Sequence, residues 1–273
     1  MSDPGAKSKI REFLRQDDDA WRLLQCAAAE VLGSAFLVFL LCGGIVGSTK
    51  AGVPLHLQVI LNVGLAIMLV IQTFGHISGA HVNPAITVGS VILGTKTLVQ
   101  AGTYIIAQYV GSILGFGLLK LVTPANMLRY SPKAPEADFC INALSDGVSV
   151  TRGLFLEFLA TMILLIVAGA FWDQRNHNNT DSVPLKFGLC VCCLAFVFGP
   201  WTSCGMNPAR SFAPAVWNGV WKDQWLFWLG PYTGAIAGAS LYRVVFGVKK
   251  EMTYDIPEAI ALNHIDGEKS ENV

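Results

Sequence analysis

Two stretches of this chain resemble each other: GHISGAHVNPA at residues 75–85 and GPWTSCGMNPA at residues 199–209. Both end in Asn-Pro-Ala, and their asparagines, Asn83 and Asn207, are 124 residues apart. Each stretch follows an apolar run of helical length and precedes a segment of about ten apolar residues, which is too short to cross a membrane. Such a segment suits a half-helix that enters the membrane from one side and returns. These two stretches therefore decide the fold.

The composition places the chain in a membrane. Hydrophobic residues make up 53% of its 273 residues, and charged residues make up only 14%. Soluble domains carry about 25% charged residues, and a globule with so few charges could not cover its surface. Lys and Arg together number 19, as do Asp and Glu, so nothing indicates a nucleic-acid partner. We therefore expect an integral membrane protein.

The gaps between charged residues mark the membrane spans. A spanning helix needs about 20 largely apolar residues. Six helix-sized apolar runs are present, at about residues 23–49, 55–74, 97–119, 153–172, 185–199 and 224–242. Together with the two short segments, they predict an all-α membrane protein with six transmembrane helices and two re-entrant half-helices.

The two halves of the chain resemble each other beyond the motifs. AEVLGSAFLVFLL around Glu30 resembles LEFLATMILLIV around Glu157, and YVGSILG resembles YTGAIAG near the end of each half. Each half holds three spans and one half-helix, so the halves cross the membrane in opposite directions. This inverted repeat places the functional site near the midplane, where the broken segments meet. We expect the first repeat at about residues 21–122 and the second at about 150–247.

The distribution of Lys and Arg predicts the orientation. With six spans both termini lie on one side, and that side holds twelve Lys and Arg residues against six on the other. Because basic loops stay in the cytosol, we expect a multi-pass protein of the cell membrane with both termini cytosolic. The chain then divides into an N-terminal tail (1–20), a membrane domain (21–247) and a C-terminal tail (248–273).

Each Asn-Pro-Ala motif has a definite chemical consequence. Proline at the first helical position loses no hydrogen bond, and the asparagine before it can cap the helix while its side-chain NH2 donates outward. The two half-helix N-termini carry partial positive charge and face each other in an inverted repeat. This arrangement can hold a water oxygen and repel cations. The predicted pore residues are Asn83, Pro84, Ala85, Asn207, Pro208 and Ala209.

With these motifs the chain resembles the aquaporins, or major intrinsic proteins, over residues 20–247. The resemblance rests on SGAHVNPAITVG at 78–89, on GMNPARSFAPA at 205–215, and on the intramembrane Glu30 and Glu157. It implies a right-handed six-helix bundle with two half-helices, a pore in each subunit, and a homotetramer in the lipid bilayer. No nucleophile–base pair or metal-ligand spacing is evident, so we expect no enzyme activity, no catalytic residue, no cofactor and no metal.

Three polar residues are interpreted as braces of the motif loops. Carboxylates inside a membrane are costly unless buried and bonded, so Glu30 and Glu157 are expected to hold loop carbonyls in place, with proton relay as the alternative. His81 is expected to pack and brace the first loop rather than to gate by pH.

Cys140 is alone in the long outer loop, so no disulfide is expected there.

The resemblance also implies a four-residue selectivity filter. Its positions fall on Val63 in the second span, Ala195 in the fifth, and Cys204 and Arg210 in the second motif loop. Water-selective members have Phe at the first position and His at the second, so this filter is wider and less polar. An apolar wall that faces one strong donor, Arg210, suits a polyol. A register shift of one residue would instead place Phe196 at the filter.

We therefore expect a passive channel for water, glycerol and urea that excludes ions and protons. The opened filter is similar to that of the insect glycerol-permeable branch, the entomoglyceroporins, although Ser211 after the arginine is typical of water channels. One alternative is a water-selective aquaporin in which an aromatic such as Phe196 refills the bore. Another is an adhesion or scaffold protein with little conduction.

Overall fold

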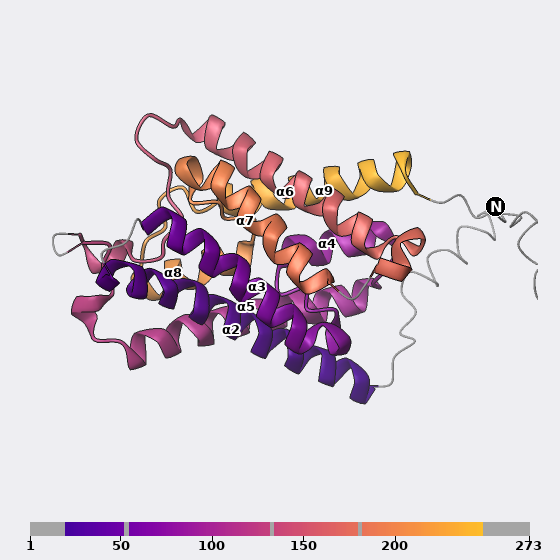
Figure 1. The fold of residues 1–273 in the computed structure, drawn as a ribbon, viewed down its shortest axis with the longest axis horizontal. Coiled ribbons are helices and arrows are strands. Elements are labelled where there is room, and N and C mark those ends of the chain that lie inside the picture. Colours follow the sequence, from indigo (N-terminus) through magenta and orange to yellow (C-terminus); the bar gives the residue numbers. More distant parts are fainter. Residues whose placement is uncertain (1–19, 52–54, 132–133, 180–181, 248–273) are drawn as a thin grey trace, which may run out of the picture.

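The computed structural model describes residues 20–51, 55–131, 134–179 and 182–247 (Figure 1). Apart from Ala20, the predicted tails at 1–20 and 248–273 lie outside the described residues. Within the described ranges, all regular secondary structure is helical. This confirms the predicted all-α class.

Six long helices and two short ones lie within the described residues. The long helices are α2 (Ala20–Ala51), α3 (Leu55–Ser78), α5 (Leu98–Val122), α6 (Val150–Trp172), α7 (Val183–Thr202) and α9 (Leu226–Val245). The short helices are α4 (Pro84–Leu93) and α8 (Pro208–Asn218), and three 3-10 segments lie in the loops: η1 (Ala125–Met127), η2 (Glu136–Asp138) and η3 (Gln174–Asn179).

The long helices have the dimensions of membrane spans. Five of them, α2, α3, α5, α6 and α7, are long and apolar enough to cross a membrane, and α9 has the 20 residues that a span requires. Several helices extend a few residues beyond the charge-free runs. Lys120 and Arg243, for example, lie in the last turns of α5 and α9, where long basic side chains can reach the membrane surface.

The two repeats interlock through their half-helices. In the first repeat α2 packs against α3 and α5, and in the second α6 packs against α7 and α9. The half-helices cross over, because α4 packs against α9 and α8 packs against α5. Figure 1 shows α4 and α8 toward opposite ends of the bundle. We call the end where α2 begins and α9 ends the terminal end, and the opposite end the loop end.

Matched glycines bring the helices of each repeat close together. A Cβ atom on Gly111 of α5 would collide with the main chain of α2, and one on Gly234 of α9 would collide with the main chain of α6. The hydroxyls of Tyr109 and Tyr232, which belong to the same repeated segments, lie 3.3 Å apart. The repeats therefore use the same contacts at matched positions.

A disulfide joins the α5–α6 loop to α2, contrary to the expectation from the sequence. Cys42 and Cys140 are bonded, with their Cα atoms 5.7 Å apart, and both are fully buried. The expectation was wrong because it considered only cysteines in the loop itself. The partner lies inside a spanning helix, 98 residues earlier in the chain.

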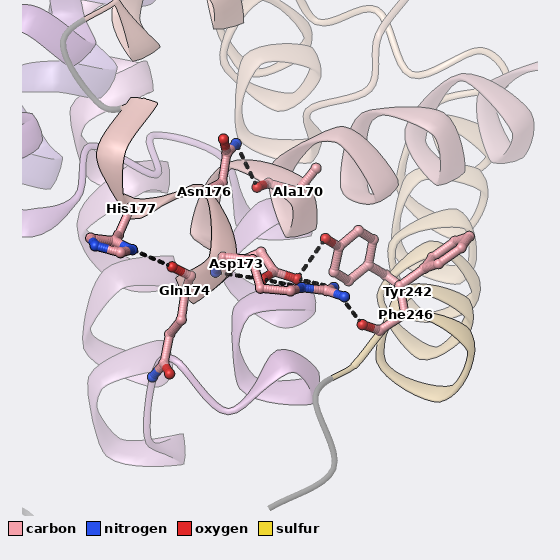
Figure 2. Close-up of polar contacts among 8 residues, drawn as sticks. Ala170, Asp173, Gln174, Asn176, His177, Tyr242 and Phe246 are labelled. Carbon is pink, nitrogen blue, oxygen red and sulfur yellow. Dashed lines mark hydrogen bonds and ion pairs between the residues drawn. The ribbon is translucent and has the colours of Figure 1, made fainter. Parts of the chain in front are cut away.

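At the terminal end, the α6–α7 connection is held against the end of α9 (Figure 2). Arg175 donates to Asp173 and to the main-chain oxygen of Phe246, with the shortest contact to each at 2.6 Å. The hydroxyl of Tyr242 donates to the same carboxylate at 2.9 Å. The guanidinium beside Asp173 holds the pKa of that carboxyl below its usual range. This contact keeps the connection beside α9.

Candidate functional site: a pore between the repeats

Each half-helix begins with the cap that the sequence predicts. The side-chain oxygen of Asn83 accepts from the backbone N–H of Ala85 at 2.9 Å, and that of Asn207 accepts from Ala209 at 3.1 Å. The proline of each motif occupies the first helical turn, where its missing N–H costs nothing. Both N-termini are thus fixed, with their partial positive charge toward the interior of the bundle.

The two asparagines also bridge the repeats. Nδ2 of Asn83 donates to the main-chain oxygen of Met206 at 2.9 Å, and Nδ2 of Asn207 donates to that of Val82 at 2.8 Å. From the motif, the NH2 group was expected to be free to donate outward. Instead, each amide uses one hydrogen to hold the opposite loop, because the loops face each other at the centre of the bundle. The second hydrogen remains for the cavity that both asparagines line.

Glu30 and Glu157 brace the motif loops through N–H groups rather than carbonyls. Glu30 accepts two main-chain N–H groups of the first loop at 2.9 and 2.7 Å, and Glu157 accepts two of the second loop at 2.8 Å each. Each glutamate thus braces its loop directly through main-chain N–H groups, and the loop carbonyls are held only through that backbone. The hydroxyls of Ser78 and Thr202 complete the two sets, each 2.6 Å from its carboxylate.

The first loop carries an additional polar network. Nε2 of Gln108, on α5, donates to Glu30 at 2.7 Å and to the hydroxyl of Thr87 at 2.9 Å. Nδ1 of His81 lies 3.2 Å from the same hydroxyl, and its ring packs against two aromatic rings. His81 therefore occupies the bracing position predicted for it. Gln108 was missed because it lies 78 residues from its carboxylate partner.

Both loops hold backbone conformations that few residues adopt. Ala80 and Val82 have φ of 45° and 42°, and Cys204 and Met206 have φ of 50° and 48°. A left-handed conformation costs about 1–3 kcal/mol per residue and persists only where the surroundings enforce it. The N–H groups of Val82 and Met206 donate to the two buried carboxylates. Those of Ala80 and Cys204 donate to the hydroxyls of Ser78 and Thr202, and together these bonds supply that enforcement.

A cavity of about 700 Å³ lies between α3, α7 and the two motif loops. On α3 its lining extends from His56 to Ile71, which is about 22 Å of helical rise. One wall is mainly apolar and consists of residues at four-residue intervals: Val59, Val63, Ile67 and Ile71 of α3, and Phe187, Val191, Ala195 and Gly199 of α7. The facing wall carries the polar side chains of Asn83, Asn207 and Arg210. The cavity is thus amphipathic along its length.

The structure brings the four predicted filter residues to this cavity. Val63, Ala195, Cys204 and Arg210 all line it. The alternative residue, Phe196, lies beside the lining face, with 44% of its surface exposed. Among the described residues, Ala195 rather than Phe196 lines the cavity.

Arg210 is held by a loop that the sequence did not single out. Its Nη1 donates to the main-chain oxygen of Cys140 at 3.2 Å and to Oδ1 of Asn142. Nδ2 of Asn142 donates in turn to the main-chain oxygen of Ser203 at 3.4 Å. The α5–α6 loop has no periodic pattern that could reveal these contacts. A cysteine at the loop end of a span, together with one in the loop, was the available signal.

His56, near the loop end of α3, also lines the cavity and was not expected from the sequence. Its Cε1 would lie 3.2 Å from a Cβ atom built on Gly199, and its ring stands edge-on to Phe196 with centroids 6.2 Å apart. His56 is seven residues before Val63, so both lie on the same face of α3. That spacing was a usable signal.

Comparisons with known proteins agree with this geometry. Residues 18–242 match the family described as Major intrinsic protein. The chain is 37% identical to Aquaporin-2 of Homo sapiens over 218 residues, which cover 80% of this chain and 77% of that protein. It is 38% identical to the lens fiber major intrinsic protein of Bos taurus over 225 residues, which cover 81% and 80%. The solved structure of the aquaglyceroporin from Plasmodium falciparum superposes with a TM-score of 0.71 at 23% identity, covering 82% of this chain and 96% of that one.

Proposed function

Because this chain belongs to the major intrinsic protein family, and is therefore a membrane channel for water and small solutes and not an enzyme, we propose that glycerol and urea are among its permeants. The observation that carries this proposal is the lining of the cavity. Val63 and Ala195 leave a wall of small apolar side chains opposite the guanidinium of Arg210.

A polyol matches the two walls of the cavity. Its carbons can lie along α3 and α7, which removes apolar surface from water. Its hydroxyls need partners, because a buried hydroxyl without a hydrogen bond costs about 1–3 kcal/mol. Asn83, Asn207 and Arg210 supply donors on the facing wall. Urea finds the same donors for its carbonyl oxygen.

The same groups oppose the passage of ions and protons. Two half-helix N-termini carry partial positive charge, and Arg210 adds a full positive charge beside the lining. Cations must lose hydration to enter so narrow a bore and meet charge of their own sign. The asparagine donors orient each permeant oxygen and interrupt a continuous proton-carrying chain of water.

Orientation and assembly complete the proposal. We place the terminal end in the cytosol of a cell and the loop end outside, which agrees with the excess of Lys and Arg near the termini. The Cys42–Cys140 disulfide at the loop end supports this placement, since disulfides persist in oxidising compartments. We further propose a channel domain at residues 21–247, built of two repeats, and a homotetramer with one pore in each subunit.

The alternative functions are less well supported. A water-selective channel needs an aromatic ring to narrow the bore, but the exposed Phe196 lies beside the lining rather than in it. A scaffold protein would not require an amphipathic cavity between two capped half-helices. The likeness of the filter to that of the glycerol-permeable insect branch rests on the small side chains of Val63 and Ala195.

The experiment compares water and glycerol permeability of the purified protein in lipid vesicles. We expect wild-type vesicles to take up glycerol well above protein-free vesicles. Ala195→His restores a ring and a donor to the bore, so glycerol uptake should fall about tenfold or more while water permeability stays within a few-fold. Phe196→Leu, one residue away, is the matched control and should leave both rates unchanged. Water flux without glycerol flux in the wild type would contradict the proposal.

A further inference from the structure

We propose that Cys42, Cys140 and Asn142 are positioning residues for Arg210: the disulfide anchors the loop whose oxygens hold the guanidinium against the wall of the bore. The inference rests on the proposed place of Arg210 in the filter. It assigns to the disulfide a part in selectivity, beyond any contribution to stability.

The anchored segment is residues 139–142, in the loop between α5 and α6. All four residues are buried, with exposed fractions of 1%, 0%, 7% and 0%. The main-chain N–H of Cys140 donates to the hydroxyl of Tyr130 at 3.1 Å, and Nδ2 of Asn218 donates to the main-chain oxygen of Phe139 at 3.0 Å. Cys140 itself has a φ of 61°, in the left-handed region. The segment thus has one fixed path beneath the surface.

Both acceptors of the Arg210 guanidinium lie on this segment. Nη1 donates to the oxygen of Cys140 and to Oδ1 of Asn142. Arg210 is only 7% exposed, and a buried guanidinium needs such partners. Its side chain has four rotatable bonds and reaches other rotamers once those acceptors move away. Arg210 also lines the cavity, so a rotamer change there would carry the guanidinium into the bore.

The disulfide is the covalent tie of this segment to a rigid helix. The α5–α6 connection spans the 27 residues between Val122 and Val150, and its only regular structure among the described residues is two short 3-10 segments. Long connections of this kind are more mobile than the helices that they join. Cys140 supplies both the sulfur bonded to Cys42 in α2 and the carbonyl that accepts from Arg210. Fixing the sulfur of Cys140 therefore also fixes its carbonyl oxygen.

Loss of the tie should narrow the bore rather than merely unfold the channel. With the segment free, Arg210 exchanges its fixed position for several, some of which obstruct the path. Glycerol has the larger cross-section, so it should be slowed more than water. A contribution to stability alone would change the amount of folded protein but not the ratio of the two permeabilities.

The test uses the full chain in vesicles, with both permeabilities measured per folded channel. In C42A/C140A we expect the glycerol-to-water ratio to fall about threefold or more. N142A, which keeps the disulfide, should lower the ratio in the same direction. The combined C42A/C140A/N142A variant should fall no further than the stronger of the two, because both act on one guanidinium. C26A removes a buried cysteine from the same helix and should leave the ratio unchanged.

Three outcomes would overturn the inference: a wild-type ratio in folded C42A/C140A, a wild-type ratio in N142A, or multiplicative effects in the combined variant. If C42A/C140A does not fold, N142A decides alone. If the wild type passes no glycerol, the proposed function fails. The water permeability of N142A, compared with that of the wild type, then decides this inference. Under that condition a fall of about twofold or more in N142A supports the inference, and an unchanged rate overturns it.

Discussion

The two motif loops have the same frame but differ in the residues that occupy it. Each loop has a capping asparagine, a cross-repeat hydrogen bond to the other loop, and a buried carboxylate that accepts two main-chain N–H groups. The third residue after the asparagine is Ile86 in the first loop and Arg210 in the second. Two residues before the asparagine, the first loop has His81 and the second loop has Gly205.

These differences give the loops different roles. The first loop forms a polar network with Gln108 and Thr87, and its His81 and Asn83 also line the cavity. At Gly205 the second loop packs closely, since a Cβ atom there would lie 3.0 Å from Oε2 of Glu157. This loop directs the charge of Arg210 to the lining, where the α5–α6 loop anchors it. Symmetry therefore builds the frame, and the two loops differ at a few unmatched positions, to which the proposed function assigns the selectivity.

The largest expected effect comes from the frame that the loops share. Glu30→Leu and Glu157→Leu each leave two buried main-chain N–H groups without an acceptor. Each variant should lose more than about 4 kcal/mol of unfolding free energy, measured as lost thermal stability and lost folded protein in detergent. The Glu→Gln variants keep an acceptor oxygen and should lose less. A severe effect at only one of the two sites would show that the frame is not shared.

The next largest difference between the loops is expected at Arg210, in the proton leak of its variants. Arg210→Ala removes the full positive charge at the lining, so proton leak into vesicles should rise about tenfold, followed with a trapped pH indicator. Ile86→Ala, at the matched position of the first loop, should leave the leak at the wild-type level. If Arg210→Ala vesicles stay as proton-tight as wild type, the arginine does not guard the bore.

Mercurials should distinguish the loops by several-fold changes in water flux. The free thiol of Cys204 lines the cavity, so block is expected in the wild type and its loss in Cys204→Ser. Ala80 occupies the matched position of the first loop and also lines the cavity. Adding Ala80→Cys to Cys204→Ser should therefore restore the block. Persistent block in Cys204→Ser alone would place the reactive thiol elsewhere, at Cys190 or Cys193 of α7.

The smallest difference is expected at two matched hydroxyls. The hydroxyls of Thr87 and Ser211 each donate to the main-chain oxygen of the capping asparagine at 3.1 Å. The hydroxyl of Thr87 also accepts a hydrogen bond from Gln108, whereas that of Ser211 does not. Thr87→Ala should cost about 1–3 kcal/mol because it leaves a buried donor unpaired, and Ser211→Ala about 1 kcal/mol or less. Melting temperatures in detergent measure the difference, with Thr87→Ser as the control. Equal losses would mean that the inward network adds nothing.

Much of the fold could be predicted from the sequence because its signals are local. Apolar runs and the two Asn-Pro-Ala motifs indicate the spans, the half-helices and the caps without any long-range contact. The filter positions Val63 and Ala195 came instead from the family resemblance, and both line the cavity. Helix ends differ by a few residues, because basic side chains near the ends are tolerated.

The anchors of the site could not be predicted in the same way. Gln108 meets Glu30 across 78 residues, and Asn142 meets Arg210 across 68. Single polar residues at such separations leave no periodic trace in one sequence. The disulfide could have been predicted only by treating cysteines inside the spans as possible partners of Cys140.

The bonds that each asparagine makes to the opposite loop, from Asn83 to Met206 and from Asn207 to Val82, impose an order on biosynthesis. The acceptor of Asn83 lies 123 residues further along the chain. At about 5–20 residues per second, a ribosome makes that acceptor about 6–25 s later. The donors that brace the first loop against Glu30 follow that carboxylate by only 48–52 residues. The first half-helix is thus braced early and waits in the membrane with an unpaired amide until the second half arrives, and Asn207 then finds the carbonyl of Val82 already in place.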